Sequence, residues 1–231
     1  MRPDDHSAVI FDVDGPLLDL TPAEEDAFFA PFRDLHGLEG LSRDWDSYAV
    51  RNDLEICREI LAGHFGRPPD DGEMQALSRG YFRALTDALD TGAAEVSEIA
   101  GARGLVQTLH GMGGIALGTA TANFREAARI RLDRVGLWSY LRRYPGAADE
   151  GGAKREVLAR VVAELGLPKD RIVFLGDNLN DLDAGLACGV HFIGFHVEEP
   201  RRARLAKAGA KATAGDHGTS LALIRGLLGL D

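Results

Sequence analysis

The sequence contains few cysteines and no long apolar run. Cys57 and Cys188 are its two cysteines, and their separation does not match the spacing of a metal site. We therefore expect both to be small buried side chains, and we expect the protein to lie in a reducing compartment, the cytoplasm. No apolar run approaches the roughly 20 residues that span a bilayer. The polar, acidic start of the chain, residues 1–6, argues against a signal peptide.

The chain also lacks an excess of positive charge. Its 26 Lys and Arg residues face 36 Asp and Glu residues, so the formal net charge is −10. This balance argues against nucleic acid or an anionic membrane as the main partner. It disfavours a phosphate ligand too, unless a metal ion and nearby cations reverse the local potential. Nothing in the sequence indicates the oligomeric state.

The 231 residues are enough for one large domain or for one domain with an insertion. Beyond about residue 100, apolar strand-like segments alternate with helix-like segments. The expected strands are residues 7–11, 114–120, 171–175 and 191–195, with a short edge strand at 211–213. The expected helices begin at Asn123, cover residues 156–164 and end the chain at 221–228. This alternation predicts an α/β fold with a doubly wound parallel sheet.

Residues 19–99 interrupt the alternation. Thr21-Pro22-Ala23-Glu24 has the form of a capping box that begins a helix. Three sets of apolar residues then recur at helical spacing: Phe28, Phe32 and Leu35; Leu54, Cys57 and Leu61; and Met74, Leu77, Tyr81, Leu85 and Ala88. We therefore expect an all-helical domain at 19–99, inserted into a core domain formed by residues 1–18 and 100–231.

The first expected strand ends in two aspartates. Asp12 and Asp14 follow the apolar run, and Gly15-Pro16 ends it. Ligands of open α/β sheets bind at the carboxyl ends of the strands. Two carboxylates at this edge repel each other unless a cation or an acid–base role stabilises them. The pair taken alone favours a solvated acidic turn over a functional site, because a motif is only a hypothesis until its context is found.

Further polar residues follow the other strands. Thr121 comes after the strand at 114–120, Lys154 follows two glycines, and Asp177 and Asp181 follow the strand at 171–175. Each has a simpler interpretation: a β-branched strand end, a solvated lysine at a helix start, and cap or turn residues. Parallel strands all end at one edge of the sheet, however, so the aspartates and Thr121 converge there. Their joint occurrence in this order favours a site.

The chemistry that suits this set is phosphoryl transfer. One carboxylate attacks phosphorus, and a second protonates the leaving oxygen and then deprotonates water. Carboxylate oxygens are also suitable ligands for Mg²⁺. A hydroxyl and an ammonium group stabilise the transferring oxygens. We expect the backbone N–H groups at the start of the helix at Asn123 to add positive potential.

These motifs resemble those of the haloacid dehalogenase superfamily. The resemblance lies in Phe11-Asp12-Val13-Asp14-Gly15, Thr121, Lys154 and Gly176-Asp177-Asn178-Leu179-Asn180-Asp181. The run Leu117-Gly118-Thr119-Ala120-Thr121-Ala122-Asn123-Phe124 is similar to the second motif of phosphoglycolate-phosphatase-like members. The resemblance extends over nearly the whole chain, and the first and fourth motifs are specific in combination.

The resemblance implies a role for each motif. Asp12 would be the nucleophile and Asp14 the acid/base. Mg²⁺ would bind Asp12, Asp177 and the main-chain carbonyl of Asp14, with Asp181 supporting the metal site. Thr121, Ala122, Asn123 and Lys154 would contact the phosphate. The helical insert resembles a cap that closes over the site and selects the substrate.

Several alternatives stay open at this point. Thr119 shares strand parity with Thr121, and Arg155 adjoins Lys154, so either neighbour could be the phosphate contact. Arg51, Asn52 and Asp53 lie near where similar proteins have a specificity loop, although a charged helix start explains them equally well. Pro16 replaces the Thr or Val common in the family, without removing a catalytic group.

Asp14 decides between activities, because similar dehalogenases lack a carboxylate at this position. We therefore expect a Mg²⁺-dependent phosphatase that hydrolyses a small phosphomonoester metabolite through an aspartyl-phosphate intermediate. A sugar-phosphate mutase of the same superfamily and a non-catalytic metabolite-binding or scaffold protein are the alternatives.

Overall fold

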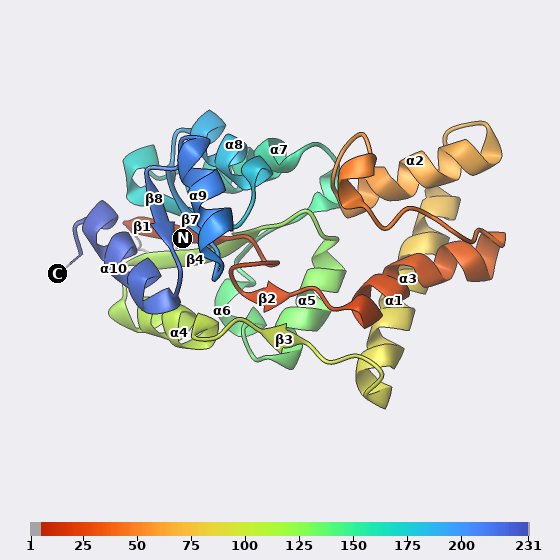
Figure 1. Ribbon diagram of the computed structural model, residues 1–231, viewed down its shortest axis with the longest axis horizontal. Coiled ribbons are helices and arrows are strands. Elements are labelled where there is room, and N and C mark those ends of the chain that lie inside the picture. Colours follow the sequence, from red (N-terminus) through yellow and green to blue (C-terminus); the bar gives the residue numbers. More distant parts are fainter. Residues whose placement is uncertain (1–5, 231) are drawn as a thin grey trace.

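The computed structural model describes residues 6–230 and contains a parallel sheet of six strands (Figure 1). The strand order is β5-β4-β1-β6-β7-β8. The strands are β1 (Ser7–Phe11), β4 (Ile115–Ala120), β5 (Tyr144–Gly146), β6 (Ile172–Gly176), β7 (His191–Phe195) and β8 (Ala212–Ala214). This sheet confirms the predicted fold class. Residues 1–5 of the polar N-terminal segment, for which we expect no signal peptide, lie outside the described residues.

Helices pack on both faces of the sheet because its strands are apolar on both sides. The side chains of Val9 and Phe11 lie on one face, and those of Ala8 and Ile10 lie on the other. The first face packs against α4 (Ala102–Met112), α5 (Arg125–Arg134), α6 (Trp138–Leu141) and α10 (His217–Leu228). The second packs against α7 (Lys154–Leu165), α8 (Leu179–Cys188) and α9 (Glu199–Lys207).

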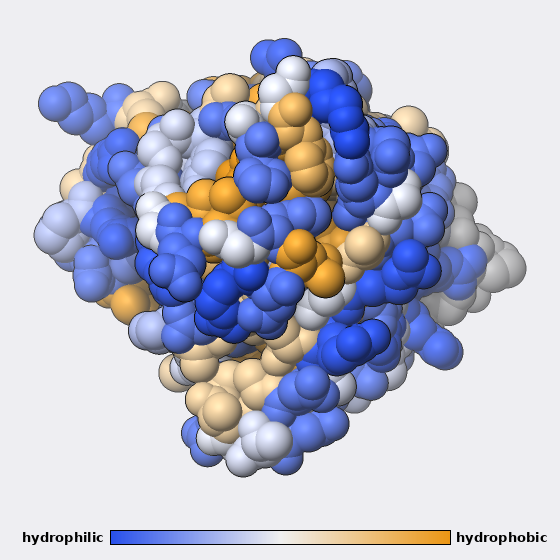
Figure 2. All heavy atoms as spheres, turned by 90° about the vertical axis from the view of Figure 1, so that its right-hand side faces the viewer, coloured by the Kyte–Doolittle hydropathy of each residue, from blue (hydrophilic) through white to orange (hydrophobic). Residues whose placement is uncertain are grey.

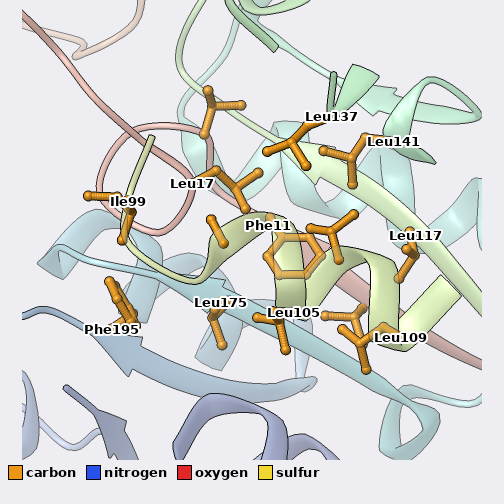
Figure 3. Close-up of a cluster of buried hydrophobic side chains, with 14 of the residues drawn as sticks. Phe11, Leu17, Ile99, Leu105, Leu109, Leu117, Leu137, Leu141, Leu175 and Phe195 are labelled. Atoms are coloured by element: carbon orange, nitrogen blue, oxygen red, sulfur yellow. The ribbon is translucent and has the colours of Figure 1, made fainter. Parts of the chain in front are cut away.

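The centre of the first face is a dense aliphatic cluster around one aromatic ring. Phe11 points into it from β1, between Leu117 of β4 and Leu175 of β6, and leucines of α4 cover the ring (Figure 3). The register is strict: Phe11 lies beside Thr119 on one side and beside Leu175 on the other. The residues that follow each of these strands therefore emerge next to one another, which brings the predicted motifs together.

The insert leaves and rejoins the core through a two-stranded antiparallel ribbon. Its strands are β2 (Leu18–Asp19) and β3 (Ser97–Glu98), and Leu18 pairs with Glu98. The ribbon lies close to the predicted boundaries of the insert. Between its strands lie α1 (Pro22–His36), α2 (Asp53–Phe65) and α3 (Asp71–Thr91), at one end of the molecule (Figure 1).

The insert has its own aromatic core. Phe28, Phe32, Leu61 and Leu85 are buried in it, and Phe124 of the core domain packs against the same cluster. The capping box at Thr21 forms as predicted. The expectation for Leu35 was wrong: this side chain is exposed, because it lies in the last turn of α1, beyond Phe32, the last buried residue of that helix. The outer face of the insert is mostly hydrophilic, with apolar atoms gathered near its centre (Figure 2).

Three further observations concern the expectations from composition. Cys57 and Cys188 are free, buried thiols. Among residues 6–230, none of the helices has the length and apolarity needed to cross a membrane. Strand β5, which the sequence did not predict, has three residues and includes Pro145, so it lacks the apolar run by which the other strands were recognised.

Candidate active site

A cavity of about 520 Å³ lies where the carboxyl ends of β1, β4 and β6 face the insert. The structure brings every predicted site residue to its wall. From the core these are Asp12, Asp14, Thr121, Ala122, Asn123, Lys154, Asp177 and Asp181, and from the insert they are Arg51 and Asn52. The parallel topology explains why the residues that follow β1, β4 and β6 converge here, whereas Arg51 and Asn52 reach the cavity because the insert packs over it.

Asp12 lies at the bottom of this cavity with both carboxylate oxygens bound. Its Oδ1 accepts a hydrogen bond from Val13 N at 2.7 Å, and its Oδ2 lies 2.7 Å from the Lys154 ammonium. Burial raises the pKa of Asp12 well above its ordinary value. Lys154 opposes this shift, while Asp181 and Asp177 add to it by like-charge repulsion.

Lys154 links two aspartates. It is the first residue of α7, and its Nζ lies 2.7 Å from Asp12 Oδ2 and 2.9 Å from Asp181 Oδ1. Burial lowers the pKa of this ammonium, but the two carboxylates outweigh burial and raise it, so Lys154 is a permanent cation. The neighbouring Arg155 also borders the cavity, but its guanidinium is exposed and pairs with Glu156 at 2.8 Å, so Lys154 is the cation that contacts the aspartates.

The loop after β6 holds its aspartates by backbone hydrogen bonds. Asn178 caps α8, and Asp181 Oδ2 accepts from Asp177 N at 3.0 Å and from Asn178 N at 3.3 Å. Asp177 packs against Gly15, where a Cβ atom would come within 2.4 Å of the Asp177 Cγ and where φ is +93°. Glycine is therefore required in the turn after Asp14 for the two loops to approach.

The acidic residues are suited to a divalent cation. Asp12, Asp177 and Asp181 each offer an oxygen within 4.8 Å of the others. Burial, with Asp181 next, raises the pKa of Asp177 to about 7, and such crowding of carboxylates is relieved by a bound metal ion. Oxygen donors of this kind suit Mg²⁺. Asp181 is already engaged by Lys154 and by the loop amides, which fits a supporting role.

Thr121 and Thr119 differ in their surroundings. The Thr121 hydroxyl lies at the cavity wall, 3.1 Å from Asn123 Oδ1 and 3.2 Å from Asn123 N. The Thr119 hydroxyl instead lies 3.4 Å from Gly146 O, toward β5. Thr121 is thus the threonine with a hydroxyl beside the cavity.

The expected start of the next helix was wrong. Helix α5 begins at Arg125, with Phe124 and not Asn123 as its N-cap. Phe124 N donates to Asp53 Oδ2 at 2.7 Å, and Arg125 N donates to Asp149 Oδ2 at 2.7 Å. Because carboxylates already accept hydrogen bonds from these two N–H groups, the start of α5 offers fewer free donors to a phosphate than we expected.

On the insert side, Arg51 and Asn52 have different environments. Arg51 is exposed and pairs with Asp46 at 3.1 Å. Asn52 is 2% exposed; its Oδ1 caps α2 through Glu55 N at 2.8 Å, and its Nδ2 donates to Gly152 O at 2.6 Å. Asn52 therefore fixes the insert to the core, while the Arg51 guanidinium stays near the cavity.

Sequence reasoning missed two buried charged residues beside the site, Arg131 and Glu24, and the contact that Asp53 makes with the core. Arg131 of α5 is 1% exposed and lies 2.7 Å from Asp14 Oδ1 and 2.6 Å from Glu24 Oε1. Asp53 joins α2 to the start of α5. Glu24 could be recognised as a capping residue, but no spacing in the sequence connects it with Arg131 or with Asp14.

Comparisons with known proteins agree with this architecture. The chain is 27% identical over 195 residues to the proteins named tyrosine-protein kinase PtkA of Mycobacterium tuberculosis and Mycobacterium bovis. The match includes 79% of this chain but only 59% of those proteins, so the chain spans less than two thirds of their length.

Solved structures show the same fold at low sequence identity. CbbY from Rhodobacter sphaeroides, in complex with phosphate, superposes with a TM-score of 0.68 at 20% identity, over 91% of this chain and 94% of that one. A putative β-phosphoglucomutase from Bacteroides vulgatus has a TM-score of 0.68 at 16% identity, over 99% and 91%. A predicted phosphoglycolate phosphatase from Haemophilus somnus has a TM-score of 0.66 at 14% identity, over 96% and 99%.

One family model matches most of the chain. It covers residues 6–189 and so includes the turn with Asp12, the helical insert, Lys154 and the loop with Asp177. Residues from each of these motifs line the cavity described above. The chain therefore belongs to the haloacid dehalogenase-like hydrolases.

Proposed function

We propose that this protein is a Mg²⁺-dependent phosphatase of a small phosphomonoester that acts through an aspartyl phosphate. The observation that favours it most is the buried Asp12, held by Lys154 beside Asp177 and Asp181. A carboxylate fixed by a cation at the bottom of a cavity is positioned to act as a nucleophile. We assign the acid/base role to Asp14, which lines the same cavity two residues away.

The reaction requires two displacements. An Asp12 oxygen attacks phosphorus while the bond from phosphorus to the alcohol oxygen breaks, and Asp14 gives that oxygen its proton. Water then attacks the phosphorus of the aspartyl phosphate and loses a proton to Asp14. The bond between phosphorus and Asp12 breaks, which releases inorganic phosphate and restores both carboxyl groups.

The remaining groups would stabilise the negative charge of the phosphate. Lys154 and the Thr121 hydroxyl, with the backbone and amide of Asn123, would bind the equatorial oxygens. Asp12, Asp177 and the main-chain carbonyl of Asp14, supported by Asp181, would hold Mg²⁺, which when bound neutralises the phosphate and lets an anionic nucleophile approach it. This local positive charge would overcome the net negative charge of the chain.

We propose that residues 19–99 act as a cap domain that encloses the leaving group. Phe28, Trp45, Tyr48 and Tyr81 of this segment line the cavity together with Arg51. Groups that bind phosphate cannot distinguish one phosphomonoester from another, so the cap would supply the selectivity. Its attachment by Asn52 and Asp53 supports a closed position over the site.

A panel of phosphorylated sugars, glycolate, nucleotides and cofactors, assayed with and without Mg²⁺, tests the proposal. We expect release of inorganic phosphate from at least one small ester, and loss of this release in Asp12→Asn. Isomerisation of a sugar phosphate, dependent on a bisphosphate activator, would indicate a mutase instead. Because relatives are named tyrosine kinases, the panel also includes an assay for transfer of phosphate from ATP to a tyrosine peptide. Binding without turnover would favour a metabolite-binding protein.

A further inference from the structure

Arg131 forms a cluster of contacts that the proposed reaction does not use. Its Nη2 lies 2.7 Å from Asp14 Oδ1 and donates to Asp19 O at 3.2 Å. Its Nε donates to Glu24 Oε1 at 2.6 Å, and its Nη1 lies 3.4 Å from Asn123 Oδ1. One buried side chain thus connects the turn after β1, the strand that enters the insert, the first turn of α1 and the loop after β4.

A guanidinium in this place is costly for the fold. Removing a charge from water is unfavourable, and well-packed apolar residues are often at least as stabilising as a buried ion pair. Burial lowers the pKa of Arg131, but Asp14 and Glu24 outweigh burial and raise it, so the group stays charged. The ion pair with Glu24 joins the insert to the core. The ion pair with Asp14 is a separate contact, made to the residue that we propose as the acid/base.

The contact with Asp14 fixes the orientation of its carboxyl group. Asp14 Oδ1 is buried against Arg131, yet 30% of the Asp14 side chain remains exposed. The second oxygen is consequently the one available to the cavity. The ion pair with Arg131 restricts the rotation of this carboxyl group, which lines the cavity.

Glu24 connects the same guanidinium to the insert. Its Oε2 accepts hydrogen bonds from the backbone N–H and the hydroxyl of Thr21, each at 2.8 Å, while its Oε1 accepts from Arg131. The capping box therefore fixes Glu24 at the start of α1. Any displacement of α1 relative to the core would pull on Arg131 and, through it, on Asp14.

We propose that Arg131 is a positioning residue that aligns Asp14 for proton transfer and makes this alignment depend on the docked insert through Glu24. The inference rests on the proposed role of Asp14. Proton donation matters most for esters whose leaving alcohol is poor, and little for activated aryl esters. Loss of Arg131 should therefore affect the two kinds of ester unequally.

The experiment compares kcat for an alkyl phosphomonoester from the screen with kcat for para-nitrophenyl phosphate. In Arg131→Met we expect kcat for the alkyl ester to fall by about 10-fold to 100-fold, with KM nearly unchanged, and kcat for the aryl ester to change by less than about threefold. Arg131→Lys keeps the positive charge but loses the planar guanidinium that contacts both carboxylates. Its kcat for the alkyl ester should lie between those of the wild type and Arg131→Met. Arg129→Met is the matched control, because Arg129 is a half-buried residue of the same helix that pairs with Glu126 and has no contact with Asp14 or Glu24 among its ion pairs.

A double-mutant cycle tests whether Arg131 acts through Asp14. In an Asp14→Asn background, Arg131→Met should cause no further loss with the alkyl ester. Equal losses for both esters in Arg131→Met, or losses that multiply in the double variant, would overturn the proposal. If Arg131→Met fails to fold, Glu24→Gln replaces it in the same cycle. We then expect a smaller loss of kcat for the alkyl ester, and equal losses for both esters or losses that multiply in the double variant would again overturn the proposal.

Failure of the proposed function gives a different result. If Asp14→Asn itself leaves both esters unchanged, Asp14 is not the acid/base, and the coupling to Arg131 falls with it. If Asp14→Asn discriminates between the esters but Arg131→Met does not, the phosphatase mechanism stands and only the role of Arg131 is rejected.

Discussion

Asp53 of the insert accepts a hydrogen bond from the backbone N–H of Phe124 in the core at 2.7 Å. Its own N–H donates to Ala122 O at 2.9 Å, so the starts of α2 and α5 are joined twice. Burial raises the pKa of the Asp53 carboxyl to about 7, although the Phe124 N–H lowers it. The contact between insert and core is therefore sensitive to pH near neutrality.

The first prediction concerns the pH dependence of stability. The pKa of Asp53 is about 7 in the folded state and ordinarily about 3.8, so the folded state binds this proton more tightly. The protonated Asp53 therefore adds to the free energy of unfolding below about pH 4, and this contribution is lost as the pH rises from about 4 to about 7. Each unit of difference between the folded and unfolded pKa corresponds to about 1.4 kcal/mol of that free energy. In Asp53→Asn, which keeps the acceptor for Phe124 but does not titrate, we expect a flatter curve, measured by urea unfolding at several pH values.

Asp149→Asn is the control for this experiment. Asp149 is an exposed carboxylate that accepts from Arg125 N at the same helix start. If the unfolding free energies of the wild type and Asp53→Asn run parallel across this pH range, Asp53 does not have the raised pKa that its burial implies.

The second prediction concerns the nucleophile. Asp12→Asn removes the anionic oxygen that would form the aspartyl phosphate, so turnover should fall by on the order of 10⁴-fold or more. Acid-quenched samples of the wild type with substrate should contain a phosphorylated peptide with Asp12, and the variant should not. Asp170→Asn removes an exposed carboxylate before β6, away from the residues that line the cavity, and is the control. Retention of a tenth of the activity in folded Asp12→Asn would reject the assignment.

The third prediction concerns the metal ion. Because Asp12, Asp177 and Asp181 crowd their carboxylates together, Mg²⁺ should raise the melting temperature of the wild type, and this rise should shrink in Asp177→Asn. A chelator should abolish turnover, and added Mg²⁺ should restore it. Full turnover in chelator, or equal stabilisation of both proteins by Mg²⁺, would contradict a metal site at Asp177.

The fourth prediction separates two neighbouring residues of the insert. Arg51→Ala should change the ranking of substrates, because the guanidinium lies at the cavity, while turnover of a small generic ester stays within about tenfold. Asn52→Ala removes the bond to Gly152 O and should lower the rates of all substrates together. A specificity profile of both variants is the measurement. An unchanged ranking in Arg51→Ala would place the selectivity elsewhere in the insert.

The sequence predicted the sheet well because its signals are local. Buried strands such as β6 and β7 are short apolar runs between turn residues, and polar residues at their ends converge in any parallel sheet. The same logic located Asp12 and Asp177. Strand β5 was missed because three residues with a proline carry no such pattern.

The electrostatic surroundings of the site could not be predicted in this way. The start of α5 was misplaced because Asp53 and Asp149, which satisfy its first N–H groups, come from distant parts of the chain. Arg131 and Glu24 are 107 residues apart, and their meeting depends on how the insert docks. Pairings of this kind follow from tertiary packing, which no local spacing encodes.

The ribbon of β2 and β3 makes the insert a separable module. Leu18 and Glu98 are hydrogen-bonded neighbours, so a tight turn could join them without stretching the chain or breaking the order of the large sheet. The segment between them can then be exchanged for a different one without rebuilding the core domain. If residues 19–99 select the substrate, as proposed above, such an exchange would change the substrate preference while the turn that bears Asp12 stays as it is.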